Sequence, residues 1–339
     1  MYNNPFRIKL FSLFLLLLII NIITVSANTI QPQNKKPTSP LFFEEVLYVD
    51  DDYNESTPGW EVDHFRSIQD AIDKATNGDT IFVFNGIYYE NVVVDKEVDL
   101  IGEDKSNTII DGLNTGRVIS FTKNGIYLTQ FTIRNSGNYL EDSGIYVGSY
   151  TNTIKNNIII ENQNGIYLKD SNSNKVLENS ITDCNYGMYL LNSDYNTLKQ
   201  NTIHNNKYGI YIQESDSNDI NSNSIQYNED GIWLKIESNE NTIAGNTIRK
   251  NSNRGIFIDR FCFNNILHRN NFFDNKYHAR FKMSILNEWE YNYWDNWIGL
   301  TVEEYRIFPK VIFGRMLGPI PWINVDRFPL YEPHINELS

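Results

Sequence analysis

The sequence predicts an all-β solenoid, a parallel β-helix with about 22 residues in each coil. Three observations predict it: a glycine-led motif that returns at a steady spacing, asparagines that return in step with it, and short apolar stretches without helical periodicity. The motif is a glycine, an aliphatic residue, an aromatic residue and a second aliphatic residue. Its glycines are Gly144, Gly165, Gly187, Gly209, Gly231 and Gly255, and they are 21, 22, 22, 22 and 24 residues apart.

Asparagines keep the same period in two series. Identical polar residues one period apart stack on successive coils, where their amides can bond along the stack, and asparagine tolerates the left-handed backbone of sharp corners. We therefore expect asparagine ladders, with a shorter serine ladder at Ser171, Ser193 and Ser215. The asparagine series are Asn152, Asn174, Asn196, Asn218, Asn241 and Asn264, and Asn157, Asn179, Asn201, Asn223 and Asn246.

Residues 1–27 have the layout of a secretory signal. Arg7 and Lys9 precede an apolar run, and small residues follow at a cleavage point ending at Ala27. We expect a secreted protein, extracellular or at the cell surface. The rival interpretation is a retained membrane anchor, which is the one membrane association that the sequence suggests. Residues 28–43 are rich in Gln, Asn, Lys, Pro, Thr and Ser and are interpreted as a linker.

Residues 44–78 are expected to hold an N-terminal strand and a capping helix. An open solenoid end is an unpaired edge that must be covered. The segment from His64 to Thr76 has apolar residues at helical spacing, and Asn77-Gly78 stops the run. We therefore predict an amphipathic helix from His64 to Thr76 that covers the first coil.

Residues 79–280 are expected to form the coils, and residues 281–339 a C-terminal cap and tail. Each repeat contains three short apolar stretches separated by turn residues, which indicates three strands in each coil. Successive coils are expected at about 4.8 Å from one another. After residue 280 the composition changes, and the aromatic-rich cap is predicted from Trp289, Trp294, Trp297 and Trp322.

The net charge disfavours one class of partner, and the two cysteines are not expected to form a disulfide. The formal net charge is −13, which disfavours nucleic acid because an acidic surface repels phosphate backbones. Cys184 and Cys262 stand at different positions of the repeat, several coils apart. A disulfide needs Cα atoms within about 7 Å, so we expect two separate thiols.

The repeat resembles the NosD-like right-handed parallel β-helix proteins of the pectate-lyase-like superfamily, which share the CASH domain of carbohydrate-binding proteins and sugar hydrolases. The resemblance rests on Gly-Ile-Tyr-Leu, Ser, Asn-Thr-Ile and Tyr-Gly in each coil, and on Tyr48-Val-Asp-Asp-Asp-Tyr and Ser67-Ile-Gln-Asp-Ala-Ile before the coils. It covers about residues 48 to 300 and implies a right-handed β-helix. The family includes binders, lyases and hydrolases, and its NosD members are described as copper-related periplasmic accessory proteins.

The sequence offers few residues for catalysis or for metal binding. Copper needs converging His, Met or Cys side chains, and the five histidines are scattered along the chain. Glycoside hydrolysis usually needs two close carboxyl groups, and the polygalacturonase-type motifs are missing from the coils. The acidic run of Asp50, Asp51 and Asp52 precedes the first coil, as a solvated loop or as a calcium site. No catalytic residue is assigned, and no cofactor other than calcium is expected.

The aromatic residue of the repeated motif is the candidate ligand site. Alternate residues of a strand face opposite sides, so the two aliphatic residues face the core and the aromatic residue points outward. Stacked aromatic side chains stabilise a sheet, and an exposed aromatic strip also suits the apolar faces of sugars. The predicted column is Tyr146, Tyr167, Tyr189, Tyr211, Trp233 and Phe257.

The sequence therefore favours a secreted β-helix that recognises a polysaccharide or a surface glycan without catalysis. The first alternative is a polysaccharide lyase, hydrolase or epimerase-like enzyme. The others are a structural surface or adhesion protein and a NosD-like copper-related accessory protein. An enzyme would show a pocket with close carboxylates or a His-Arg pair, a binder an open aromatic groove, and a structural protein a covered aromatic column.

Overall fold

The computed structural model describes residues 45–297, 301–302, 305–306, 309–316 and 321–334. The predicted signal of residues 1–27 and the linker of residues 28–43 therefore lie outside the described residues. Residues from Glu44 onward form one compact unit, whose described part is the subject below. Within the described ranges, no helix has the length and apolar character needed to cross a membrane.

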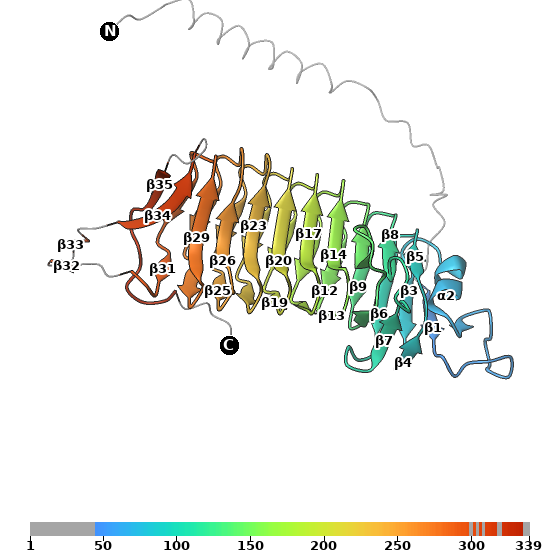
Figure 1. Cartoon of the computed structure of the whole chain (residues 1–339). Helices are drawn as coiled ribbons and strands as arrows, with labels where there is room; N and C mark the ends of the chain where they lie inside the picture. Colours follow the sequence, from blue (N-terminus) through green and yellow to red (C-terminus); the bar gives the residue numbers. More distant parts are fainter. Residues whose placement is uncertain (1–44, 298–300, 303–304, 307–308, 317–320, 335–339) are drawn as a thin grey trace, which may run out of the picture. The chain divides into compact units, whose positions relative to one another are not determined.

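Three columns of parallel strands run along the stack of coils (Figure 1). In each regular coil the chain passes once through each column, and each strand pairs with the strands one coil before and after. The fold is therefore the predicted parallel β-helix. The first column, called the aromatic sheet below, contains β5 (Val92–Val94), β8 (Ile119–Phe121), β11 (Ser143–Val147), β14 (Asn164–Lys169), β17 (Tyr186–Leu191), β20 (Tyr208–Gln213), β23 (Asp230–Lys235), β26 (Arg254–Ile258) and β29 (Tyr277–Lys282).

The other two columns complete each coil. The second column contains β1 (Val46–Val49), β3 (Thr80–Val83), β6 (Asp99–Gly102), β9 (Tyr127–Thr129), β12 (Thr153–Lys155), β15 (Lys175–Leu177), β18 (Thr197–Lys199), β21 (Asp219–Asn221), β24 (Thr242–Ala244), β27 (Ile266–His268) and β30 (Glu288–Glu290). The third contains β4 (Gly86–Tyr88), β7 (Thr108–Asp111), β10 (Thr132–Arg134), β13 (Ile158–Ile160), β16 (Ser180–Thr182), β19 (Thr202–His204), β22 (Ser224–Gln226), β25 (Thr247–Arg249), β28 (Asn271–Phe273) and β31 (Tyr293–Trp294).

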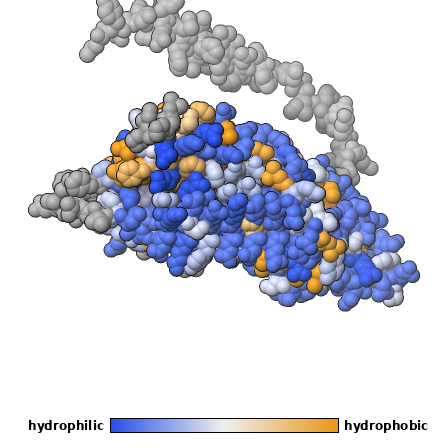
Figure 2. Space-filling model, in the orientation of Figure 1, coloured by the Kyte–Doolittle hydropathy of each residue, from blue (hydrophilic) through white to orange (hydrophobic). Residues whose placement is uncertain are grey.

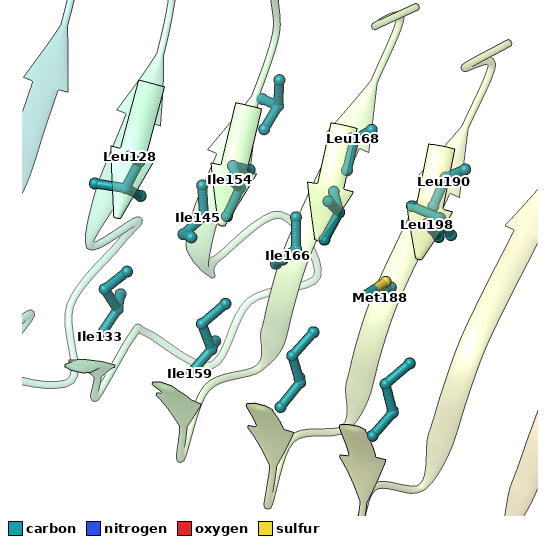
Figure 3. Close-up of a cluster of buried hydrophobic side chains, with 14 of the residues drawn as sticks. Leu128, Ile133, Ile145, Ile154, Ile159, Ile166, Leu168, Met188, Leu190 and Leu198 are labelled. Atoms are coloured by element: carbon teal, nitrogen blue, oxygen red, sulfur yellow. The ribbon is translucent and has the colours of Figure 1, made fainter. Parts of the chain in front are cut away.

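The core is a stack of aliphatic side chains inside the coils (Figure 3). In β14, Ile166 and Leu168 are fully buried, and Ile166 lies in register with Met188 of the next coil. Burial of one such side chain stabilises the fold by about 1.5–3 kcal/mol. Because every coil repeats the same inward positions, the core runs unbroken along the described coils.

The glycine of the motif is required by the closeness of neighbouring coils. A Cβ placed on Gly187 would lie 2.6 Å from the Gly209 carbonyl oxygen and 3.0 Å from Ile203 Cγ2. Neither group can move away, since one is backbone of the next coil and the other is core. The regular spacing of this glycine in the sequence is therefore a packing requirement of the fold.

Buried asparagine ladders close two corners of the coils, as predicted. Asn201 shows the pattern: its Nδ2 donates to the Val176 carbonyl (2.8 Å) and to Asn223 Oδ1 (3.0 Å), while its Oδ1 accepts from the Asn179 backbone N–H (3.0 Å). The ladder satisfies backbone groups that would otherwise be buried without partners. The serine ladder is also confirmed, since the Ser171 and Ser193 backbone N–H groups donate to the hydroxyl of the serine one coil on.

One predicted ladder member is wrong. Asn241 is followed in its ladder by Asn265, whose Oδ1 accepts from the Asn241 backbone N–H at 2.9 Å. Asn264 instead takes the left-handed corner, with φ of 56°, which asparagine tolerates well. Two adjacent asparagines fit the period equally well in sequence, and the corner geometry decides between them.

A third asparagine ladder and both cysteines belong to the corners as well. Asn206, Asn228, Asn251 and Asn275 continue this ladder, and the Cys184 backbone N–H donates to Asn206 Oδ1 at 2.9 Å. Cys262 stands next to the serine ladder, where its N–H donates to the Ser284 hydroxyl. The two thiols are buried and unpaired, as expected, and burial raises the pKa of each to about 12.

The N-terminal helix is shorter than predicted. α2 spans Ile68–Lys74 and buries Ile68, Ala71 and Ile72, as the helical spacing indicates. His64–Phe65 forms β2 and pairs with β1, and the Ser67 hydroxyl accepts from the Asp70 backbone N–H as an N-cap. The predicted start at His64 is therefore wrong because strand pairing and a serine cap take the residues before the helix.

The coils continue beyond the predicted end at residue 280. Trp289 in β30 and Trp294 in β31 are buried core residues of a last coil, and the Phe272 and Trp294 rings stack at 4.2 Å. After that coil, β34 (Lys310–Arg315) and β35 (Pro321–Asp326) form an antiparallel hairpin that pairs with β29 and β30. β32 (Thr301–Val302) and β33 (Tyr305–Arg306) form a separate two-stranded pair.

Candidate functional site

The predicted aromatic column is aligned in the aromatic sheet. Parallel pairing places Tyr146 beside Tyr167, and the same register continues through the remaining four members to Phe257. Ring centroids of neighbours lie 4.8–5.7 Å apart along the column. The column therefore lies on the outer side of the sheet, opposite the aliphatic core.

The centre of the column is covered, contrary to the expectation of an exposed strip. Tyr167, Tyr189 and Tyr211 retain only 2%, 7% and 5% of their exposure. They are covered by one another and by Tyr186 and Tyr208, which form a second, parallel row on the same sheet. Burial raises the pKa of the Tyr189 hydroxyl to about 12. A sugar ring therefore cannot stack on the faces of these three central rings.

The column opens at its C-terminal end into a groove of about 390 Å³, called the cationic groove below. Phe257 ends the aromatic column, and Tyr277 of the next coil contributes a ring that is 39% exposed. Four basic residues also lie along it. The full lining is Asn253, Arg254, Phe257, Tyr277, Arg280, Phe281, Lys282, Gly314 and Arg315.

Strand register explains how the groove is assembled. Arg280 stands in β29 in register with Phe257, so it continues the column with a guanidinium in place of a ring. Lys282 of β29 lies in register with Arg315 of the C-terminal hairpin. The Arg280 guanidinium carbon lies 4.1 Å from the Tyr277 ring centroid, a cation–π contact. The groove therefore joins open aromatic surface with positive charge.

Arg254 is the member of the groove whose charge is neutralised. Its Nε and Nη2 each lie 2.7 Å from the Asp230 carboxylate, which is a bidentate pair. Its guanidinium carbon also lies 4.5 Å from the Trp233 ring centroid and 4.0 Å from that of Phe257. Arg254 therefore fixes the end of the aromatic column in place.

A second groove of about 380 Å³ lies at the N-terminal end of the aromatic sheet. Its charged lining is mixed, since Arg117 and Asp142 both contribute. The Arg117 guanidinium lies over the Tyr146 ring, with its carbon 3.4 Å from the centroid, and pairs with Glu141 at 3.1 Å. This end of the sheet carries no surplus of positive charge among the residues that line the groove.

The other predicted or catalytic-type groups do not assemble a reactive site in the described residues. Asp50, Asp51 and Asp52 bring ligand atoms within 4.8 Å of one another, and calcium binding there stays a prediction. No group of three or more ligand side chains with a histidine or cysteine occurs in the described ranges. The His334 backbone N–H and carbonyl bond to the Asn271 side chain and hold the tail against β28.

Two polar groups that the sequence did not single out are structural. Asp194 and Asp216 lie on neighbouring coils, and Asp194 Oδ1 accepts from the Asp216 backbone N–H at 2.7 Å, as in a ladder. Burial raises the pKa of Asp216. Buried His278 bonds through Nε2 to Asp295 Oδ1 at 2.6 Å. The sequence signal for Asp194 and Asp216 was their repetition one coil apart. The signal for His278 was a histidine at the position where the preceding coils have glycine.

A family model described as "Right handed beta helix region" matches residues 77–195 and 143–287. No match was found among curated proteins. The narrower resemblance to NosD-like proteins and the CASH domain stays a prediction.

Several solved structures share the fold at low sequence identity. The pectate lyase Pel9A is 13% identical with a TM-score of 0.58, over 76% of this chain and 82% of that one. XylC in complex with xylose is 11% identical with a TM-score of 0.57, over 74% and 69%. The periplasmic alginate epimerase AlgG is 19% identical with a TM-score of 0.53, over 68% of each chain. At these identities the likeness extends to the fold alone.

Proposed function

We propose that this chain, which belongs to the right-handed β-helix family, binds a polysaccharide or a surface glycan on its aromatic sheet without catalysing a reaction. The observation that carries the proposal is the cationic groove, where the aromatic column ends in open ring surface. Secretion through the predicted signal of residues 1–27 is part of the proposal, since a polysaccharide partner lies outside the cell.

The groove suits a sugar chain in size and chemistry. Its volume of about 390 Å³ falls in the range of small-molecule sites, roughly 300–1,000 Å³. Phe257 and Tyr277 supply ring surface for the apolar faces of sugars, and basic and amide groups supply hydrogen-bond donors. One coil rises by about 4.8 Å, similar to the length of a hexose unit, so successive sugars could follow successive coils.

Solved structures of the same fold support a carbohydrate partner. They include a pectate lyase, an alginate epimerase and XylC in complex with xylose. The groove favours binding over hydrolysis because its described lining contains no carboxyl group, whereas glycoside hydrolysis usually uses two. Polysaccharide cleavage or epimerisation is the alternative, and it would be recognised by shortening or isomerisation of the bound glycan.

A glycan array on the protein lacking residues 1–27 tests the proposal, with Tyr277→Ala as the variant and Tyr139→Ala as its control. Tyr139 is 84% exposed in a loop and lines none of the grooves described above. We expect binding to at least one polysaccharide and a loss of about tenfold or more in Tyr277→Ala, which corresponds to about 1.4 kcal/mol.

Three results would count against this proposal. An array without any bound glycan would remove the basis for polysaccharide recognition. Equal binding by wild type and Tyr277→Ala would move the site away from the groove. Shorter or isomerised products recovered from the bound glycan would replace the non-catalytic proposal with the enzymatic alternative.

A further inference from the structure

The cationic groove departs from the charge of the whole chain. The formal net charge of the protein is −13, yet four basic side chains line this groove and none of its described lining residues is acidic. Figure 2 shows that the visible face of the coils is mostly hydrophilic. A local cluster of cations in an acidic protein calls for an electrostatic explanation.

Three of the four cations lack an acidic partner in the part of the chain that the structure describes. Arg254 is neutralised by Asp230, but Arg280, Lys282 and Arg315 form no ion pair among the described residues. Asp259, which follows β26, lies 3.7 Å from the Arg260 guanidinium and does not line the groove.

The register brings these three cations onto adjacent strands. Lys282 and Arg315 are direct partners in parallel pairing, and Arg280 precedes Lys282 by two residues and so shares its side of β29. Like charges on neighbouring strands repel one another, which is destabilising unless a counter-charge is present. An anionic group bound between them would relieve the repulsion and would meet arginine donors in bidentate geometry.

We propose that the groove binds a sugar unit that carries an anionic group, a carboxylate or a sulfate. This inference rests on the proposed polysaccharide function and names the chemical class of its ligand. The sugar ring lies against Tyr277 and Phe257, and its anionic group meets Arg280 and Arg315. The N-terminal groove has a mixed lining, so the charged sugar is recognised at the C-terminal end of the sheet.

Two pairs of polymers with matched backbones separate the sources of charge. Polygalacturonate and its methyl ester differ in the carboxylate, and dextran sulfate and dextran differ in the sulfate. We expect at least one charged member to bind about tenfold or more tightly than its uncharged partner, with an affinity that falls as salt rises. The charged pair that binds identifies the anionic group.

The variants Arg280→Gln and Arg315→Gln test the residues, with Arg249→Gln as the matched control. Arg249 is an exposed arginine in β25 of the third column, bonded to Gln226 and outside the groove. Each groove variant should lose about tenfold in affinity for the charged polymer and show a weaker salt dependence, whereas the control should bind as the wild type does. Circular dichroism melting curves verify that each variant is folded.

The outcomes separate this inference from the proposed function. Equal binding of charged and uncharged polymers, with a loss only in Tyr277→Ala, would overturn the anionic preference and leave polysaccharide recognition standing. An equal loss in Arg249→Gln and the groove variants would also overturn it, because diffuse surface charge would then explain the binding. Absence of binding to all four polymers and to the glycan array would overturn both.

Discussion

Replacing Tyr189 with alanine should destabilise the fold substantially. The Tyr189 ring lies 4.8 Å from that of Tyr167, 5.3 Å from Tyr186 and 5.1 Å from Tyr211, and it is 7% exposed. An area of about 150 Å², at the low end for a buried aromatic side chain, gives about 4 kcal/mol at about 25 cal/mol per Å². The conversion overestimates the burial energy because the unfolded chain already buries part of this area. Water can fill the gap on the outer side of the sheet, so no closed-cavity term is added. We expect a loss of about 2–4 kcal/mol in the free energy of unfolding.

Urea unfolding followed by far-ultraviolet circular dichroism measures this loss, with Tyr139→Ala as the exposed control. The control should change the free energy of unfolding by no more than about 0.5 kcal/mol. A loss below about 1 kcal/mol in Tyr189→Ala, together with abolished glycan binding, would mean that the Tyr189 ring contributes little to packing. The central rings would then be a ligand surface and not a structural stack.

The remaining predictions concern a ladder and a buried histidine. Asn201→Ala leaves the Asn179 backbone N–H and the Val176 carbonyl buried without their partner. Because each unpaired group costs about 1–3 kcal/mol, the free energy of unfolding measured with urea should fall by about 2–6 kcal/mol. Burial lowers the pKa of His278 below 6.5 in the folded state, so the unfolded state takes up the proton first as pH falls. The stability of wild type relative to His278→Gln should therefore be constant above about pH 7 and fall below about pH 6.5, as measured by melting at each pH.

Each of these two predictions has a contradicting result. A loss below about 1 kcal/mol in Asn201→Ala would mean that water replaces the ladder bonds at little cost. A wild-type stability that rises relative to His278→Gln on acidification would mean that the Asp295 carboxylate outweighs burial and that the folded state holds the charged imidazole.

The neutral state of His278 also follows from the ladder geometry. Asn275 Oδ1 accepts from the Asn251 backbone N–H, which fixes the orientation of the Asn275 amide. Its Nδ2 therefore faces His278 Nδ1, at 3.2 Å, and an amide N–H can only donate. The proton of the neutral ring then lies on Nε2, which donates to Asp295.

The coils were predictable because the residues that repeat with their period cannot be replaced by other residue types without loss of packing or hydrogen bonds. Gly187 has no room for a Cβ, and Asn201 satisfies backbone groups on two neighbouring coils. Such requirements recur at the same place in each coil, so spacing alone revealed strand number, register and the outward column. The third asparagine ladder was missed because Cys184 interrupts its series in the sequence.

The proposed binding surface was less predictable, since it depends on contacts between different rows of side chains. Alternation placed Tyr189 outside the core, but it could not show that Tyr186 and Tyr208 cover the central rings. The cationic groove also needs Arg315, which reaches Lys282 through the C-terminal hairpin and outside any period. Residue spacing therefore predicted which rings align but not where the column is open.

Hydroxyl-radical footprinting of the protein with and without a bound polysaccharide maps the side chains that the polysaccharide covers. Reactive side chains at the groove are Phe257 and Tyr277, and Tyr139 and Tyr195 are exposed aromatic residues elsewhere. We expect protection of Phe257 and Tyr277 by the polysaccharide, with Tyr139 and Tyr195 unchanged. Protection at Tyr139 or Tyr195 with the groove left reactive would contradict recognition at the C-terminal end of the aromatic sheet.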